Sequence, residues 1–227
     1  MPNKHPSSKP SGAPSERSQV RRAADRGHYD QPTIHAIVDA AHVCHVAFAA
    51  SDETAVSVLC IPTACWRLDD RLFIHGSNGS RMMKRLGQGA SACVTITHLD
   101  GLVMARSAFS HSMNYRSVVI HGRFEVITDE EKTAVLDALM DHLAPGRKHE
   151  VRAPDSTELN ATTVLAIPLA EAAAKIRAWG PHDKPEDLDH PVWSGVLPIL
   201  QTRSTPQTEP AWSGPMPHYV STWVQPA

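Results

Sequence analysis

Short runs of apolar residues, many of them alternating with polar ones, dominate the middle of the chain and predict strands. They are rich in Val, Ile, Thr and Phe, and turn-like segments such as LDD and SNGS separate several of them. The predicted strands are 43–49, 55–61, 71–75, 90–98, 102–109, 117–127, 162–167 and 173–179. Short strands at this spacing are typical of a barrel or a sandwich.

Three other segments repeat their apolar residues at helical spacing. These predicted helices are 32–41, 79–86 and 129–142. Pro32 suits a first helical turn, and Ser77 and Asn78 are candidate caps for the second helix. Thr128 and Glu131 have the capping-box spacing at the start of the third. The predicted fold class is therefore mainly β with a few helices.

The two ends of the chain differ from this middle part. Residues 1–28 combine four prolines with Ser, Lys and Arg and have almost no large apolar side chain, which predicts a disordered arm. Residues 201–227 are again rich in proline, but they also contain Trp212, Tyr219 and Trp223. We therefore expect one domain over 29–200, and a C-terminal tail that drapes over a neighbouring surface.

Composition narrows the class of protein. The 227 residues include 22 Lys and Arg against 24 Asp and Glu, so bulk electrostatics gives no reason to expect nucleic-acid binding. No stretch approaches the roughly 20 apolar residues of a membrane helix, and the first residues lack the apolar middle of a secretory signal. The expectation is a soluble cytoplasmic protein.

Cysteine and histidine give no metal or triad motif. None of the four cysteines, Cys44, Cys60, Cys65 and Cys93, belongs to a C-x-x-C pair, and we expect buried reduced thiols. The 14 histidines include no H-x-H or H-E-x-x-H spacing, and no G-x-S-x-G elbow supports a Ser/His/Asp triad. We predict no metal site.

The segment FIHGSNGSRMMK is the most informative one chemically. It is typical of a strand that ends in a loop of small residues, followed by a helix with two cations in its first turns. Hydroxyl groups, a guanidinium and closely approaching backbone suit a phosphate monoester. The alternative is an ordinary capped helix with a solvated basic face. The segment is neither a Walker motif nor G-x-G-x-x-G.

A second polar segment, 97–117, crowds polar and aromatic side chains at the junction of two strands. Such side chains are costly to bury unless they bind a ligand or hydrogen-bond one another. Both interpretations remain open from the pattern alone.

Resemblance to a known family rests on four segments, FIHGSNGSRMMKRL, VTITHLDGLVMARSAFSHSMNYRSVVIHGRFEVI, PGRKHEVR and KIRAWGPHDKPEDLDHPVWSGVLP. These resemble the flavin-nucleotide-binding proteins of the pyridoxamine 5'-phosphate oxidase-like superfamily, in the branch that contains the nitroimidazole-resistance proteins. The similarity covers roughly residues 25–200 and neither tail.

The resemblance implies an FMN-binding split β-barrel and a homodimer with FMN in two equivalent clefts at its interface. The residues that it implies at the phosphate are His75, Gly76, Ser77, Ser80, Arg81 and Lys84. Those implied at the flavin ring are Val58, Leu59, Tyr115, Arg116 and Ser117. The resemblance also implies contributions to each flavin cleft from the C-terminal part of the partner subunit. The candidates for these contributions are Lys175, Arg177 and Trp193.

The implied function is an FMN-dependent oxidoreductase that reduces a small electrophile with NADH or NADPH. In it, Arg81 and Lys84 would neutralise the phosphate, and Arg116 or a backbone amide would stabilise the reduced ring. His75 would be the catalytic proton donor, or else only a hydrogen-bonding group at the phosphate or loop.

Two departures separate the chain from pyridoxamine-phosphate oxidase itself. The strand VSVLCIPT has no basic residue, and the R-x-H substrate motif is missing from KIRAWGPHDK. The resemblance therefore does not extend to oxidation of pyridoxamine phosphate. The alternatives to an oxidoreductase are a flavin carrier or sensor without turnover, and a split barrel that binds haem.

Overall fold

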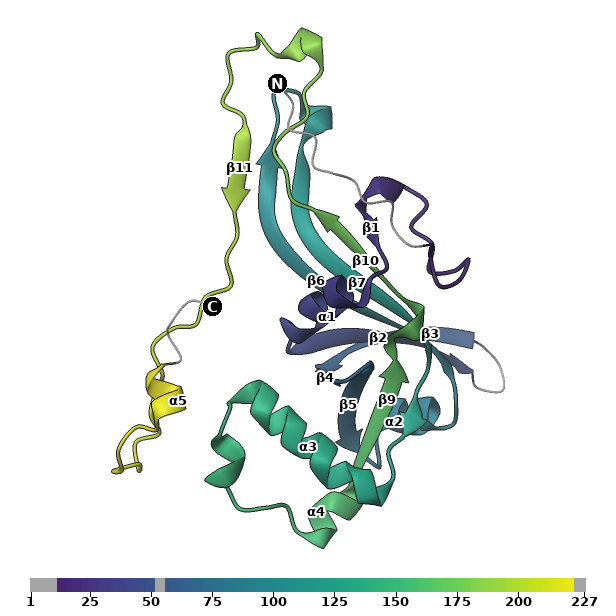
Figure 1. The fold of residues 1–227 in the computed structure, drawn as a ribbon, viewed down its shortest axis with the longest axis vertical. Coiled ribbons are helices and arrows are strands. Elements are labelled where there is room, and N and C mark those ends of the chain that lie inside the picture. The colour runs from purple at the N-terminus through teal and green to yellow at the C-terminus, as the bar shows by residue number, and fades with distance from the viewer. Residues whose placement is uncertain (1–11, 52–55, 223–227) are drawn as a thin grey trace.

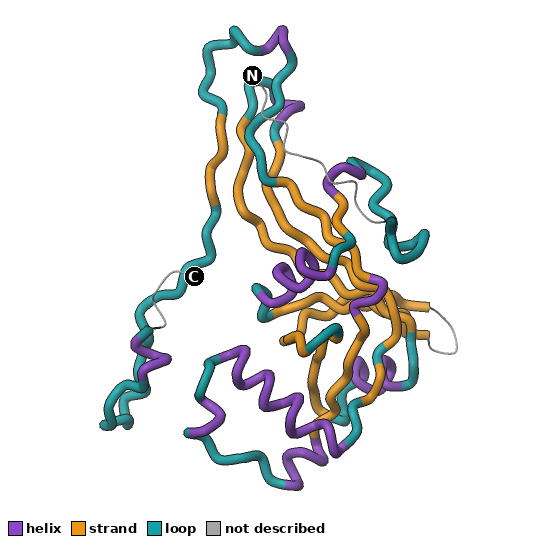
Figure 2. Tube along the Cα trace, viewed as in Figure 1, coloured by secondary structure: helices purple, strands orange, loops and turns teal. Residues whose placement is uncertain are grey.

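A computed structural model of the chain describes residues 12–51 and 56–222 (Figure 1). Its strands are β1 (Gly27–His28), β2 (Val43–Ser51), β3 (Val56–Ala64), β4 (Trp66–Leu68), β5 (Arg71–Ser77), β6 (Ser91–Met104), β7 (Ser112–Arg123), β8 (Glu125–Val126), β9 (Thr162–Pro168), β10 (Ala172–Arg177) and β11 (Gly195–Pro198). Its α-helices are α1 (Gln31–Asp39), α2 (Arg81–Gly87), α3 (Asp129–Leu143), α4 (Ser156–Ala161) and α5 (His218–Ser221). Strands outweigh helices (Figure 2), so the predicted mainly β class is confirmed.

The larger of two sheets has the strand order β1-β10-β7-β6-β2-β3. β11 pairs with the C-terminal end of β6, at 101–104, whereas β2 pairs with the N-terminal part of β6. All of its pairings are antiparallel. β2 pairs with β6 only at 45–48 and 92–95, so the β6–β7 hairpin extends beyond the body of the domain as an arm (Figure 1). The arm is thus one continuous piece of the main sheet.

The smaller sheet, β4-β5-β9-β8, packs against the larger one and encloses the main core. Alternation along β5 assigns side chains to two layers, because successive residues of a strand point to opposite faces. Leu72 and Ile74 join the main core, whereas Phe73 joins a second core beneath α3. α1 and α2 add their apolar faces to the main core.

The second core centres on Trp66, whose side chain is 0% exposed. Its indole Nε1 donates to the backbone oxygen of Val135 on α3 at 3.1 Å, and its ring stacks on Phe73 with centroids 5.8 Å apart. An indole N–H that finds a partner is the condition for burying tryptophan at low cost. Trp66 therefore joins α3 to the smaller sheet.

The C-terminal segment returns along the arm and then crosses to α3. Asp183 accepts hydrogen bonds from the backbone and guanidinium of Arg106 at 2.8 and 2.9 Å, and β11 then pairs with β6. At α5, Tyr219 donates to Glu150 at 2.7 Å and accepts from Arg147 at 2.9 Å. This part of the tail thus contacts the segment that follows α3. Trp212 is 56% exposed, and Trp223 lies outside the described residues.

Residues 1–11 of the predicted disordered arm also lie outside the described residues. The part from 12 to 28 contacts the domain instead of standing alone. β1 pairs with β10, the backbone N–H of Val20 donates to the hydroxyl of Tyr29 at 2.8 Å, and Arg17 forms an ion pair with Glu171. Backbone pairing and an ion pair thus hold a segment that has few apolar residues.

Several predicted boundaries were wrong. The predicted strands 90–98 and 102–109 are one strand, β6, because a bulge between Leu99 and Gly101 carries the turn-like LDG through the sheet. Thr128 makes no side-chain cap; the capping box lies at α4, between Asp155 and Glu158.

One expectation about the cysteines was also wrong, because Cys60 is exposed rather than buried. No helix in the described ranges is long and apolar enough to cross a membrane.

Candidate functional site

The end of β5, the short connection after it and the first turn of α2 contain the predicted phosphate-binding residues. We call residues 75–84 the loop after β5. β5 pairs with β9 along its whole length, which fixes where His75, Gly76 and Ser77 lie. α2 begins after Ser80, whose hydroxyl oxygen accepts from the backbone N–H of Met83 at 3.4 Å. The hydroxyl oxygen of Ser77 accepts from the N–H of Gly79 at 3.2 Å. Each hydroxyl keeps its own hydrogen for a ligand oxygen.

Asn78 anchors this loop to the smaller sheet. Its backbone N–H donates to Ala161 at 3.1 Å, and its side-chain oxygen accepts from the hydroxyl of Thr163 at 2.6 Å. Its side-chain amide also donates to the backbone oxygen of Asn160. The sequence suggested only a cap for Asn78, because its partners lie more than 80 residues away.

Arg81 and Lys84 lie three residues apart on the exposed face of α2, with Met82, Met83 and Leu86 buried on the opposite face. Residues at this spacing are neighbours on a helix surface. Within the described ranges neither cation has a hydrogen bond or an ion pair. The loop therefore combines two available cations with two hydroxyl donors, which is a suitable environment for a phosphate.

His75 projects toward the second core rather than into the main core. Its ring meets Trp66 edge-on, with centroids 5.7 Å apart, and its Nδ1 is buried without a hydrogen-bond partner among the described residues. Burial lowers the pKa of His75 below its ordinary value of 6.5. At neutral pH the imidazole is uncharged, so it is better suited to accept a proton or a hydrogen bond than to act as a standing acid.

We expect the free energy of unfolding to fall as the pH drops below about 6.5. Burial lowers the pKa values of His42, His75 and His121, with His142 and Arg203 adding to the effect on His42. The unfolded chain, where these groups have their ordinary pKa, therefore takes up protons first, and protonation favours unfolding. Urea denaturation at about pH 7.5 and about pH 5.5, above the range where most carboxylates titrate, measures the change. In His75→Gln the fall should be smaller; an identical fall would contradict the role of His75.

The predicted residues on β7 and β10 form a second group, which we call the Tyr115 group: Tyr115, Arg116, Ser117, Lys175 and Arg177. The register pairs Tyr115 with Arg177 and Ser117 with Lys175. Arg116 donates two hydrogen bonds of 2.9 Å to the carboxylate of Asp100. These hydrogen bonds raise the pKa of the Arg116 guanidinium. Arg116 is thus already neutralised by its own chain.

The other two cations of this group also bind the chain itself. Arg177 is 3% exposed and donates to the backbone oxygens of Trp179 and Gly180 at 2.8 and 3.0 Å. Lys175 donates to the backbone oxygen of Arg22 at 2.8 Å. The structure therefore gives Arg177 a structural role. The hydroxyl of Ser117 donates to the backbone oxygen of Lys175 at 3.3 Å, so the hydroxyl of Tyr115 is the group of this pair of strands best suited to donate to a ligand.

The remaining predicted residues lie apart from both groups. Val58, on the edge strand β3, is 77% exposed, whereas Leu59 packs against the main core. Trp193 is 63% exposed and precedes β11 on the arm. Within one chain the phosphate loop belongs to the smaller sheet and the Tyr115 group to the larger one, so the structure does not bring all predicted residues into a single cleft.

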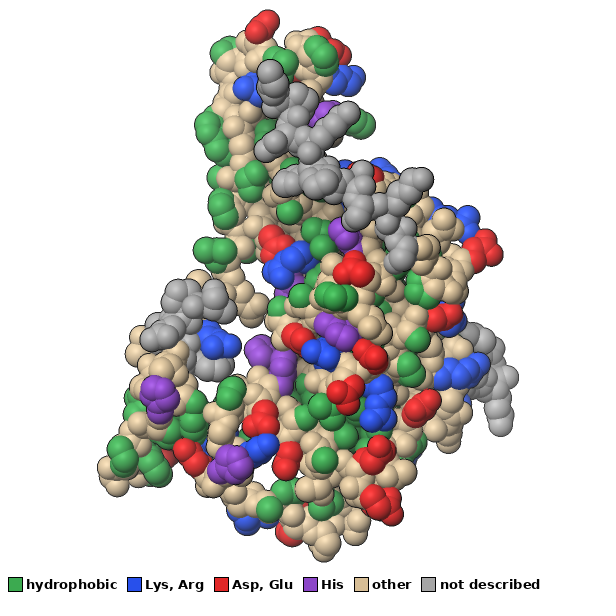
Figure 3. Space-filling view, viewed as in Figure 1, with side chains coloured by type: hydrophobic (Ala, Val, Ile, Leu, Met, Phe, Trp, Pro, Cys, Tyr) green, Lys and Arg blue, Asp and Glu red, His purple; other side chains and the backbone are tan. Residues whose placement is uncertain are grey.

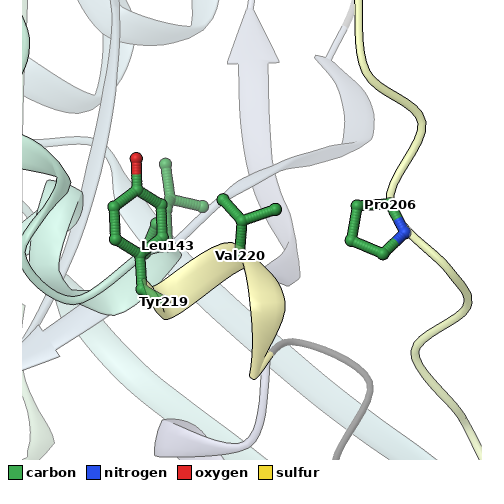
Figure 4. A pocket seen from close by; sticks show the side chains of 5 residues that line it. Leu143, Pro206, Tyr219 and Val220 are labelled. Carbon is green, nitrogen blue, oxygen red and sulfur yellow. The ribbon is translucent and has the colours of Figure 1, made fainter. Parts of the chain in front are cut away.

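Neither of two pockets in the described chain contains a predicted site residue. One lies among Ser15, Glu16, Arg17 and Arg21. The other is lined by Leu143, Ala144, Pro206, Tyr219 and Val220, between the end of α3 and the C-terminal segment (Figure 4). The tyrosine ring borders this second pocket while its hydroxyl is held by Glu150. It is a packing gap under the tail rather than a site with reactive groups.

Comparison with known proteins gives a family match and close structural relatives. The family model for pyridoxamine 5'-phosphate oxidase matches residues 30–176. A flavocytochrome from Azotobacter vinelandii is 36% identical, with a TM-score of 0.85, over 94% of this chain and 99% of its own. The FAD and haem binding protein from Mycobacterium smegmatis is 35% identical, with a TM-score of 0.82, over 88% of this chain and 97% of its own.

A more distant neighbour shares the fold. The candidate 5-nitroimidazole antibiotic resistance protein from Bacteroides thetaiotaomicron is 22% identical, with a TM-score of 0.53, over 65% of this chain and 84% of its own. No curated protein sequence matches the chain. The split-barrel class expected from the sequence is confirmed by this agreement and by the two sheets around one core.

Proposed function

The chain belongs to the pyridoxamine 5'-phosphate oxidase family, and on this basis we propose that it is a flavin-nucleotide-binding oxidoreductase. The observation that carries the proposal is the loop after β5, where Arg81 and Lys84 have no partner in the described chain and Ser77 and Ser80 keep a hydroxyl hydrogen to donate. The names of the two relatives, a flavocytochrome and an FAD and haem binding protein, support the same cofactor class.

The phosphate next to the ribityl chain is common to FMN and FAD, so the loop suits both. The sequence resemblance implies FMN, whereas the Mycobacterium smegmatis relative is named for FAD. Chromatography of the ligand released from denatured protein distinguishes the two.

A bound flavin would supply electron transfer from a nicotinamide donor, NADH or NADPH, to a small electrophilic acceptor. The chain's part is to bind and orient. Arg81 and Lys84 would neutralise the phosphate, and Asn78 would hold the loop in its binding shape. Tyr115 would donate its hydroxyl at the ring edge, where the Ser117 hydroxyl, which donates to Lys175, would accept. His75, uncharged at neutral pH, would serve as a proton acceptor, or only as a hydrogen-bonding group.

The split of the predicted residues between two sheets supports a flavin site shared by two copies of the chain. In a homodimer, the loop after β5 of one copy and the Tyr115 group of the other would together line each cleft. Carrier or sensor function without turnover stays the alternative to catalysis.

Haem binding is a second candidate function, because both relatives that cover most of the chain are named for haem or as a cytochrome. One residue of the chain has the chemistry of a haem-iron ligand. Imidazole is a common iron ligand, and His75 has a buried Nδ1 without a partner in the described chain. His75 is therefore the residue that we would test first as a haem ligand.

The absorption spectrum of the purified protein tests both functions. We expect flavin bands, bleached anaerobically by NADH or NADPH and restored by a nitro compound or a quinone. A Soret band that His75→Ala removes would support the haem function. A carrier would show flavin bands that neither nucleotide bleaches. A colourless protein that takes up neither added FMN nor added FAD would overturn the proposal.

A further inference from the structure

Two guanidinium groups lie over one indole ring at the end of β10. The Cζ atom of Arg26 is 5.1 Å from the centre of the Trp179 ring, and that of Arg177 is 5.0 Å from the same ring. Arg26 belongs to the N-terminal segment, whereas Arg177 is the last residue of β10. The face of an aromatic ring attracts a cation but has no net charge. The ring therefore holds two like charges together without neutralising either.

The N-terminal segment is fixed to the domain on both sides of Arg26. We call residues 15–28 the strap; it runs beside β10 (Figure 1). After Arg26, Gly27 pairs with Lys175 in the sheet. Before it, the backbone oxygen of Arg22 accepts a hydrogen bond from Nζ of Lys175 at 2.8 Å. The position of Arg26 over the indole is thus set by the backbone of the strap as well as by its own side chain.

The carboxylates of the strap do not neutralise this pair of cations. Charged side chains of both signs lie at this edge of the domain (Figure 3). Glu16 forms an ion pair with Arg21 at 2.7 Å, and Arg17 forms one with Glu171. Asp25 is exposed and forms no ion pair with any residue that the structure describes. The acidic groups here are therefore either engaged with other cations or directed to solvent.

Both guanidinium groups lack a carboxylate partner within residues 12–51 and 56–222. Arg177 is buried and donates to neutral acceptors, the side-chain oxygen of Asn114 and two backbone oxygens. Burial and the charge of Arg26 lower the pKa of Arg177, yet an arginine stays charged at neutral pH. Arg26 has no side-chain hydrogen bond in these ranges, and its Nε is buried without a partner. Because unpaired buried charge is costly, a bound anion would stabilise the pair.

We propose that Arg26 binds the phosphate or carboxylate group of a small-molecule ligand, with Trp179 holding its guanidinium and Arg177 adding to the positive potential. The planar fork of guanidinium N–H donors matches both of these oxyanions. The register pairs Arg177 with Tyr115, so the Tyr115 hydroxyl is a further donor on the neighbouring strand. The site belongs to the larger sheet and is separate from the loop after β5, which belongs to the smaller one.

Arginine footprinting of the full-length protein as purified tests the proposal. Phenylglyoxal modifies accessible guanidinium groups, and mass spectrometry of the peptides reports each arginine separately. Compared with chloride at equal ionic strength, inorganic phosphate at about ten times its dissociation constant should slow modification of Arg26 roughly 10-fold. Arg21, on the same strap and paired with Glu16, is the internal control and should react at an unchanged rate. Protection of Arg81 without protection of Arg26, or equal slowing of Arg26 and Arg21, would overturn the proposal.

A set of variants gives an independent measurement. The double variant Arg81→Ala with Lys84→Ala removes the cations of the loop after β5. In this background, phosphate should still raise the thermal unfolding midpoint relative to chloride at equal ionic strength. Adding Arg26→Gln should abolish the rise, whereas adding the matched control Arg21→Gln should preserve it. The proposal is wrong if the background shows no rise, or if the rise survives Arg26→Gln.

Two sources supply this anion chemistry: a free phosphate or carboxylate, and the diphosphate of a nicotinamide nucleotide. The second source rests on the proposed function, whereas binding of a free anion does not. Footprinting is therefore repeated with acetate, NADH and NADPH. Protection of Arg26 by a nucleotide at a concentration at least about 10-fold below that of phosphate would assign the site to the electron donor. Protection by phosphate or acetate alone would support the site and count against its use by the donor.

Discussion

Replacing Arg81 and Lys84 together by alanine should weaken flavin binding by at least about 100-fold. Each charge-assisted hydrogen bond contributes about 1.5–3 kcal/mol, and the double variant removes both cations from the phosphate at once. Neither side chain has another partner in the described chain, so the fold itself loses little when they are removed. Titration of the apoprotein with FMN, and separately with FAD, followed by flavin fluorescence, measures the change.

A matched control removes the same charge elsewhere. Arg21 and Lys184 are exposed cations on the N-terminal segment and near the arm tip, and their ion pairs are local. The double variant Arg21→Ala with Lys184→Ala should bind flavin as the wild type does. Equal affinity of all three proteins would show that the phosphate does not bind at the loop after β5.

Trp66→Ala should lower the free energy of unfolding by about 3–5 kcal/mol, because it removes a fully buried indole and leaves a cavity. The backbone oxygen of Val135 would lose its donor, and Phe73 would lose its stacking partner. α3 would then be held to the smaller sheet by the remaining apolar contacts and by the ion pair of Glu131 with Arg71 of β5. Denaturant unfolding followed by circular dichroism measures the effect.

Two further substitutions separate packing from the hydrogen bond. Trp66→Phe keeps an aromatic ring and loses the donor, so its cost should fall clearly below that of alanine. Trp212→Ala removes the same side chain from a position that is 56% exposed and should change stability little. A Trp66→Ala protein as stable as Trp212→Ala would contradict the second core.

The fold was predicted from the sequence where apolar patterns are local and uninterrupted. The predicted helix 129–142 corresponds to α3, and the predicted strand 162–167 to β9. The short strands β4 and β11 were missed because they have few residues and owe their place to their partners. The split of β6 in the prediction had a physical cause: Asp100 and Gly101 are turn-forming residues, and only the neighbouring strands keep them in a bulge.

The candidate site was partly predictable for a related reason. The loop with Arg81 and Lys84 is contiguous in sequence, so its chemistry could be read locally. The separation of this loop from the Tyr115 group depends on sheet order, and the hydrogen bond from Arg177 to the side chain of Asn114 depends on the pairing of β10 with β7. Neither has a local signal. The roles of the other predicted residues stay predictions.

The anchor at Asn78 has a consequence for how the protein is made. The loop takes its shape from Asn160, Ala161 and Thr163, so a ribosome must add more than 80 residues after Asn78 before those partners exist. During that interval the strand β5 also waits for its neighbour β9. The loop therefore takes the shape that the proposed phosphate site requires only late in synthesis, after α4 and the start of β9 have emerged.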